Sequence, residues 1–156
     1  MAGEIYRDAA RLVQEERWAA LATLDGGLPL STMVAYTPEP GLGGLVMFLS
    51  GLAAHTRALL ADPRCSLAVT RPDGGKGDPQ LLPRVSIQGR VEALEPESKE
   101  HAAAKALYLA RFPDAEPRFE LADFVLFRFV PSEARYVGGF ARAIRMTGSQ
   151  LAGAAS

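Results

Sequence analysis

The side chains best suited to bind an anion in this sequence lie between residues 50 and 57. A short apolar segment ends at Ser50, and the helix expected after it begins with His55, Thr56 and Arg57 in its first turn. The start of a helix presents free N–H groups and the positive end of the helix dipole, which favour a phosphate or a carboxylate. The residues leave open the alternative that Ser50 only caps the helix and that His55 is a surface residue.

Two further segments combine residue types that would suit a planar ligand. The expected strand at residues 30–36 mixes hydroxyl-bearing and apolar side chains. Near the end of the chain, paired glycines lie between Tyr136 and Phe140, so the backbone there could approach a ligand closely between two aromatic rings. Each segment also has a plain structural interpretation, as a half-buried strand and as a turn that ends a strand.

The motifs of several common chemistries are missing. The sequence has no complete dinucleotide fingerprint, no phosphate-binding loop and no G-x-S-x-G nucleophile elbow. Its two histidines are His55 and His101, and neither has a second ligand at metal-binding spacing. The single cysteine, Cys65, opens an expected strand and is interpreted as a buried structural thiol. We therefore expect no metal site, and the pattern identifies no catalytic residue.

The composition indicates one soluble domain over residues 1–156. Apolar residues make up 48% of the 156 residues, which excludes a disordered chain, and the net charge of −1 excludes a generally basic nucleic-acid binder. No apolar run is long enough to span a bilayer, and the first residues do not form a signal peptide. The lone cysteine fits a reducing compartment, so we expect a cytoplasmic protein with no membrane or nucleic-acid partner.

The hydrophobic pattern predicts several short strands and three helices. Helices are expected at residues 5–17, within the segment 51–63, and at 96–112. Asp62-Pro63 ends the second of these helices. Strands are expected at 18–24, 28–36, 45–49, 65–70, 84–94, 124–130 and 133–137, with a hairpin at residues 25–27 and a turn at Pro131-Ser132. In the strand 84–94 alternate residues share an apolar face, and Gly89 would allow a bend. Strands mostly follow strands, which favours an antiparallel β-barrel or rolled sheet with peripheral helices over a doubly wound fold.

Five motifs in the chain match, in order, the pattern of a known family. They lie at residues 30–36, 48–59, 62–67, 84–92 and 135–143, and they are spread over about residues 10–146, nearly the whole chain. The sequence resembles the FMN-binding split β-barrel proteins of the pyridoxamine 5'-phosphate oxidase-related group, and above all their haem-utilisation-like branch. The resemblance implies a mainly β (α+β) fold, a split antiparallel β-barrel with a core at about residues 17–140, and a homodimer with cofactor sites at the interface.

The resemblance also implies which residues would contact the cofactor. The second strand would lie along the flavin, and the end of the third strand with the next helix would hold its phosphate. Arg84 matches a position that contacts flavin or phosphate, and Tyr136 and Phe140 match a region that the partner subunit supplies. Carried onto this sequence, the cofactor-binding set is Ser31, Thr32, Met33, Val34, Leu49, Ser50, His55, Thr56, Arg84, Tyr136 and Phe140.

The implied function is that of an FMN-dependent oxidoreductase, which passes hydride through the flavin to a small-molecule substrate. Tyr36 is a hypothetical proton donor for that reaction, and the loop at residues 72–83 is expected to border the pocket. The alternatives are a deazaflavin in place of FMN, a non-catalytic flavin- or haem-binding module that carries, senses or stores its ligand, and a purely structural dimerisation domain.

The sequence departs from the family pattern in three places. Ala54-His55 stands where the oxidase subgroup has an Arg-Lys pair, and the segment 140–145 lacks that subgroup's Arg-x-His signature. The sequence therefore does not predict pyridoxamine phosphate oxidation. Residues 147–156 contain no histidine, so we expect no haem-iron ligand from this C-terminal segment.

Overall fold

The computed structural model describes residues 2–139 and 142–155. Its strands are β1 (Trp18–Asp25), β2 (Leu28–Ala35), β3 (Thr37–Pro38), β4 (Leu45–Ser50), β5 (Arg64–Thr70), β6 (Arg84–Ala93), β7 (Phe124–Val137) and β8 (Ala143–Thr147). Its α-helices are α1 (Ala2–Glu15), α2 (Ala54–Ala61), α3 (Lys99–Arg111) and α4 (Gly148–Gly153). Short 3₁₀ helices are η1 (Pro40–Leu42), η2 (Pro79–Leu81) and η3 (Pro113–Glu120).

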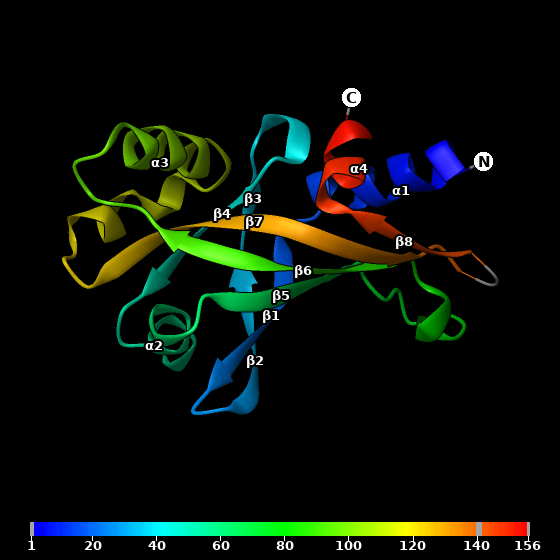
Figure 1. Cartoon of the computed structure of the whole chain (residues 1–156), viewed down its shortest axis with the longest axis horizontal. Helices are drawn as coiled ribbons and strands as arrows, with labels where there is room; N and C mark the ends of the chain where they lie inside the picture. The colour runs from blue at the N-terminus through cyan, green and yellow to red at the C-terminus, as the bar shows by residue number, and fades with distance from the viewer. Residues whose placement is uncertain (1, 140–141, 156) are drawn as a thin grey trace.

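The strands form one antiparallel sheet that curls into a barrel (Figure 1). Its order is β2-β1-β5-β6-β7-β4-β3, with β8 beside β7. The two ends of this order are consecutive in the chain, because β2 ends at Ala35 and β3 begins at Thr37, so the sheet must close on itself. Tyr36, between them, is fully buried. Within the described residues no ladder joins β2 to β4, which leaves the barrel split there. The predicted split antiparallel β-barrel with peripheral helices is confirmed.

The first hairpin is confirmed residue by residue. Asp25 pairs with Leu28, so Gly26 and Gly27 form a two-residue turn between β1 and β2. Both glycines have positive φ, 59° and 82°, as a type I′ turn requires. Since turn length fixes the register of a hairpin, this turn also fixes which side chains of β2 face the barrel interior.

The predicted turn at Pro131-Ser132 is wrong, because β7 runs through these residues as one strand. The ladder with β6 shifts there: Gln88 pairs with Glu133, whereas Gly89 pairs with Pro131, so Ser132 is an extra residue in a β-bulge. The Ser132 hydroxyl donates to the Gln88 carbonyl oxygen at 2.9 Å. Proline cannot donate a ladder hydrogen bond, and a bulge tolerates this loss. The register shift lies at Gly89, so the irregularity predicted at this residue is confirmed as a bulge.

Helices cover the barrel on two sides (Figure 1). Leu12 and Val13 of α1 are buried in the main core, where α1 and α4 lie close together. At the other end α3 and η3 cover a second apolar cluster, in which the rings of Phe48 and Phe119 stack with centroids 3.8 Å apart. The expected helix at 5–17 is shifted toward the N-terminus, and the expected helix at 96–112 is shorter than predicted, since Ser98 caps it by accepting from His101 N–H.

Several short elements were not predicted from the sequence, namely β3, β8, α4 and the 3₁₀ helices. They are too short to show a hydrophobic period, which is the signal that reveals longer elements. One local signal exists at α4: Thr147 and Gln150 form a capping box, in which each side chain bonds the other residue's backbone N–H. No helix in the described part of the chain is long and apolar enough to cross a membrane.

Candidate functional site

The structure brings two predicted site residues, Thr32 and His55, into direct contact. Thr32 lies on β2 and His55 in the first turn of α2, and the Thr32 Oγ1 and His55 Nδ1 atoms share a hydrogen bond of 2.9 Å. Partial burial lowers the pKa of His55 from its ordinary value, because a charged imidazole loses hydration there. The His55 imidazole is therefore neutral at neutral pH, and its bonded nitrogen is occupied by Thr32.

The loop before α2 satisfies its own polar groups. Ser50 Oγ accepts a hydrogen bond of 3.2 Å from Leu52 N–H, and Arg57 Nη1 donates to the Leu52 carbonyl oxygen at 2.8 Å. The N-cap residue of α2 is Ala53, which offers no side-chain cap. The alternative in which Ser50 caps the helix is thus wrong, whereas an anion site at this helix start stays a prediction.

The alternation of β2 divides its predicted residues between two faces of the sheet. Ser31 and Met33 are exposed on the outside, whereas Thr32 is half-buried and Val34 is buried on the inside. The resemblance implied that all four lie along one cofactor. Ser31 and Met33 are thus accessible from the outer side and Thr32 and Val34 face inward, and a role of all four in cofactor binding stays a prediction.

The outward side chains of β2, β1, β5 and β6 form a continuous surface, which we call the outer face. The strand register places them in rows: Ser31 lies opposite Ala22, Ala22 opposite Ser66, and Ser66 opposite Gln88. The next row runs through Met33, Ala20, Ala68 and Ser86. Most of these side chains are small, and two large apolar ones, Trp18 and Met33, are 58% and 45% exposed.

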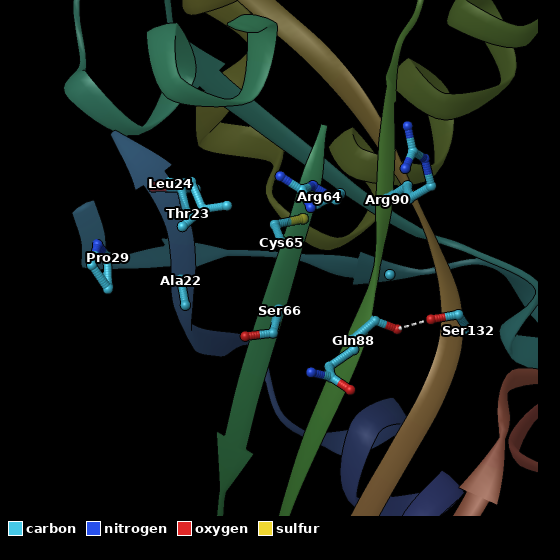
Figure 2. Close-up of a pocket in the computed structure, with 11 residues that line it drawn as sticks. Ala22, Thr23, Leu24, Pro29, Arg64, Cys65, Ser66, Gln88, Arg90 and Ser132 are labelled. Atoms are coloured by element: carbon cyan, nitrogen blue, oxygen red, sulfur yellow. Dashed lines mark hydrogen bonds between the residues drawn. The ribbon is translucent and has the colours of Figure 1, made fainter. Parts of the chain in front are cut away.

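A groove of about 550 Å³ opens at one end of the outer face (Figure 2). Figure 2 shows Arg64 and Arg90 on neighbouring strands beside this groove, with Ser66 and Gln88 further along the same strands. The remaining lining residues come from β1, β2, β5, β6 and β7: Ala22, Thr23, Leu24, Pro29, Cys65, Gly89 and Ser132. Five strands thus contribute to one concave surface, and its charged side chains are both arginines.

Arg64 and Arg90 lie directly opposite each other in the ladder between β5 and β6. Like charges in this position repel, so the arrangement costs stability unless an anion compensates it. Asp62 does so for Arg64, with hydrogen bonds of 3.0 Å and 2.7 Å that hold the pKa of Asp62 at about 2. Among the described residues Arg90 has no ion pair with a carboxylate, so the two guanidiniums keep a net positive charge.

Cys65 lines the groove, and its thiol has low reactivity. Burial raises the pKa of its thiol to about 12, and the charge of Asp62 adds to that effect. A thiolate is the reactive form of cysteine, so this thiol is a poor nucleophile at neutral pH. The prediction of a structural rather than a reactive thiol fits this environment.

Arg84 and Tyr136 lie at the far end of β6 and β7 from the groove, where Arg84 pairs with Val137. Arg84 Nη1 donates hydrogen bonds to the carbonyl oxygen of Gln80 and to that of Leu82, the latter at 3.2 Å. These bonds stabilise the η2 turn. Tyr136 is buried in the main core. None of the described residues of the 72–83 loop lines this groove, and the expectation that the loop borders a cofactor pocket stays a prediction.

The other predicted site residues are not gathered at the groove. Thr56 is fully buried on α2, and its hydroxyl has no hydrogen-bond partner among the described residues. Leu49 is buried in the main core. Phe140 lies outside the described residues. For these positions a role in cofactor binding stays a prediction.

The hypothesis that Tyr36 donates a proton is wrong. Its ring is fully buried, and its hydroxyl donates to the Val13 carbonyl oxygen at 2.7 Å. Burial raises the pKa of Tyr36 well above that of a free tyrosine. Tyr36 therefore fastens α1 to the barrel and has no contact with the outer face.

Sequence reasoning missed the two arginines of the groove, although each lies within a motif that it singled out. Arg64 follows Asp62-Pro63, and Arg90 belongs to the polar face of the long predicted strand. The motifs do not contain the register between β5 and β6, which places Arg64 opposite Arg90. In the described part of the chain, no group of three or more His, Cys, Asp or Glu side chains could hold a metal ion.

Two curated proteins are similar to this chain. The chloroplastic non-canonical heme oxygenase HOZ of Arabidopsis thaliana is 34% identical over 122 residues, which are 78% of this chain and 36% of that protein. Heme oxygenase HutZ of Vibrio cholerae is 26% identical over 152 residues, 96% of this chain and 85% of that protein. The chain thus spans only about a third of the chloroplastic relative.

The solved structures and the family comparison agree with the observed fold. A heme binding protein from Mycobacterium smegmatis has a TM-score of 0.83 and 32% sequence identity, covering 98% of this chain and 60% of that one. The family model described as "CREG, beta-barrel" matches residues 4–150. This match covers nearly the whole chain and confirms the resemblance to split-barrel proteins that the motifs indicated. The chain therefore belongs to the CREG β-barrel family.

Proposed function

We propose that this chain is a haem-binding protein, and that its groove holds the carboxylate groups of the tetrapyrrole. The observation that carries this proposal is the pairing of Arg64 with Arg90 across β5 and β6. Guanidinium groups bind carboxylates through paired N–H donors, and Arg90 has no carboxylate partner among the described residues. The names of the relatives, which are heme oxygenases and a heme binding protein, support haem as the ligand.

The groove offers contacts for the ring and the carboxylates of a haem molecule but, within the described residues, no ligand for its iron. Its volume of about 550 Å³ lies within the range of small-molecule sites, and Ala22, Leu24 and Pro29 offer apolar contacts to a planar ring. Arg64 and Arg90 suit the carboxylates. The described lining residues include no histidine or methionine, and burial keeps the Cys65 thiol protonated, so we assign no iron ligand to the groove. Bound haem would supply redox chemistry through its iron, while these residues bind and orient it. We therefore propose that the chain binds haem, as a non-catalytic haem-binding module would, and we propose no reaction.

We further infer that a second copy of the chain covers the outer face. The exposed surface is 8710 Å², whereas a compact monomer of this mass is expected to expose about 7,600 Å². The outer face combines the small side chains of Ala20 and Ala68 with exposed Trp18 and Met33, which suits a flat apolar contact. Since the groove opens on this face, a ligand there would lie beside the second copy.

FMN remains the second candidate for the same surface. Ser31, Met33 and Arg84, which the resemblance assigns to the flavin, are all exposed and belong to strands of the outer face. A flavin ring is planar and its phosphate is anionic, so it shares the chemistry that the groove offers. The two cofactors are separated by direct binding measurements.

The test is a titration of the purified protein with haem, followed by the shift of the haem absorption band, with FMN titrated separately by fluorescence quenching. We expect haem to bind, and the double variant Arg64→Ala/Arg90→Ala to bind it at least about tenfold more weakly, since two charge-assisted contacts are lost. Arg118→Ala is the matched control, because Arg118 is an exposed arginine away from the groove. Iron-free protoporphyrin should show the same loss.

Two results would contradict the proposal. One is equal haem affinity in the double variant and the Arg118 control. The other is FMN binding at a much lower concentration than haem, with the same dependence on Arg64 and Arg90, which would establish the flavin alternative.

A further inference from the structure

A second cavity, of about 540 Å³, lies between α3 and the barrel and has no residue in common with the groove. Its walls are mainly apolar and come from α3, from β4 and from the residues that follow β6. The apolar lining residues are Pro40, Val46, Leu94, Ala103, Ala104 and Leu107. The space exists because α3 presents alanines at two successive positions where larger side chains would fill it.

Three charged residues also line this cavity, and two of them pair with each other. Glu39 and Arg128 form a two-point ion pair, with Nε–Oε1 and Nη2–Oε2 distances of 2.5 Å and 2.9 Å. Arg128 Nη2 also donates to the Gly43 carbonyl oxygen at 3.3 Å, which ties the loop after β3 to β7. This pair is partly buried and held in place from two elements, so it forms a defined polar edge on an otherwise apolar cavity.

The balance of charge among the lining residues is negative. Glu39 already neutralises Arg128, and Glu92 lies opposite Arg128 in the ladder between β6 and β7. The remaining charged lining residue is Glu100 on α3, which makes no ion pair within the described residues. The cavity therefore has an excess of carboxylate and no free cationic group in its lining, which disfavours an anionic ligand and favours a cationic one.

We propose that this cavity is a binding site for a small molecule with an apolar body and a protonated amine. The apolar body packs against Val46, Leu94 and Leu107, and the amine lies near Glu100 on α3. Its volume is that of a small-molecule site. The site is independent of the haem proposal, since neither its residues nor its charge are those of the groove.

The experiment compares three probes that share one apolar body, namely phenylbutylamine, phenylbutanol and phenylbutyrate. Binding to the full chain is measured by calorimetry. We expect the amine to bind at least about tenfold more tightly than the carboxylate, with the alcohol between them. Glu100→Gln should reduce the advantage of the amine over the alcohol by about two- to fivefold, as expected for one exposed ion pair.

Two substitutions on α3 locate the site. Ala103→Phe places a ring in the cavity and should weaken amine binding at least about tenfold. Ala106→Phe is the matched control, because Ala106 is also exposed on α3 but does not line the cavity, and it should leave binding unchanged. Haem affinity should be the same in both variants, so a failure here is distinguishable from a failure of the haem proposal.

The proposal is overturned if none of the probes binds at millimolar concentration, if the carboxylate binds as tightly as the amine, or if Ala103→Phe and Ala106→Phe bind the amine equally well. If Ala103→Phe does not fold, the Glu100→Gln comparison decides by itself: an unchanged preference for the amine overturns the proposal.

Discussion

Thr32 Oγ1 and His55 Nδ1 lie 2.9 Å apart, so a side-chain hydrogen bond joins β2 to the first turn of α2. β2 is the first strand in the sheet order, and among the residues that the structure describes it pairs along its length only with β1. A strand with one open edge is less constrained than a central strand. The contact with α2 therefore helps to hold β2 in the position from which Ser31 and Met33 face outward.

Acid should weaken the fold through His55. Burial lowers its pKa in the folded state, so the folded state binds a proton less readily than the unfolded chain. The resulting stability is present above the unfolded pKa of about 6.5 and is lost as the pH falls through the folded value. An NMR titration should place the pKa of His55 below 6.5, and the urea midpoint of the wild type should fall with acid.

The variant His55→Gln isolates this effect, since glutamine keeps a neutral polar group and does not titrate. Its urea midpoint should change less between pH 7 and pH 5 than that of the wild type. His101→Gln is the control, because His101 lies on α3 and does not contact β2. Equal pH dependence in the wild type and His55→Gln would contradict this account.

Arg111 should be important for stability. Its guanidinium donates to three carbonyl oxygens, those of Gln14, Glu16 and Tyr36, at 2.6 Å, 2.8 Å and 3.2 Å. It thereby joins the end of α3 to the C-terminal end of α1 and to Tyr36, which follows β2. Arg111→Ala should lower the free energy of unfolding by about 2–4 kcal/mol, because partly buried carbonyls lose charged donors. Urea denaturation measures this, and Arg118→Ala, on the surface, should change stability by less than about 0.5 kcal/mol.

Gly89 should not tolerate even a methyl group. A Cβ at this position would overlap the Val130 carbonyl oxygen and lie 2.8 Å from the ring of Phe129. We expect Gly89→Ala to lower the free energy of unfolding by about 1–3 kcal/mol, since the bulge must shift to make room. Gly74→Ala is the matched control, because nothing lies within 4 Å of its added Cβ. Similar urea midpoints for the two variants would show that the bulge is not tightly packed.

Cys65 should react slowly with alkylating reagents. A pKa of about 12, compared with 9.0 for a free thiol, lowers the thiolate fraction at pH 8 about a thousandfold. Mass spectrometry should therefore detect little modification by iodoacetamide in the native protein and complete modification in urea. Rapid alkylation of the native protein would mean that the sheet opens readily around Cys65.

The outer face should mediate self-association. Ala68 is small and exposed at the centre of a row on this face, so Ala68→Glu would place a charge inside the proposed contact. We expect a dimer for the wild type and a predominantly monomeric variant, measured by sedimentation. Leu52→Glu, at a residue 75% exposed on the loop before α2, is the control and should remain dimeric. A monomeric wild type would contradict the proposal.

The parts of the fold that the sequence predicted are those with a strong local signal. The strand at 84–94 shows period-two burial, with Val85, Ile87 and Val91 all inside, and Gly26-Gly27 directly specifies the hairpin between β1 and β2. The short β8 and α4 lack such a signal. The turn predicted at Pro131-Ser132 was wrong because a proline disrupts a ladder equally in a turn and in a bulge, and only the pairing with β6 distinguishes them.

The spacing of apolar residues along the chain was enough to predict the fold class and which side chains of the strands and helices face inward. That information is local, because burial of apolar surface dominates the free energy of folding and leaves a period in the chain. Tertiary structure alone decided that Arg64 meets Arg90, that Thr32 bonds His55, and that Tyr36 is buried. Side chains on an exposed face leave no period that identifies their partners, since the register between distant strands is set by packing on the opposite face.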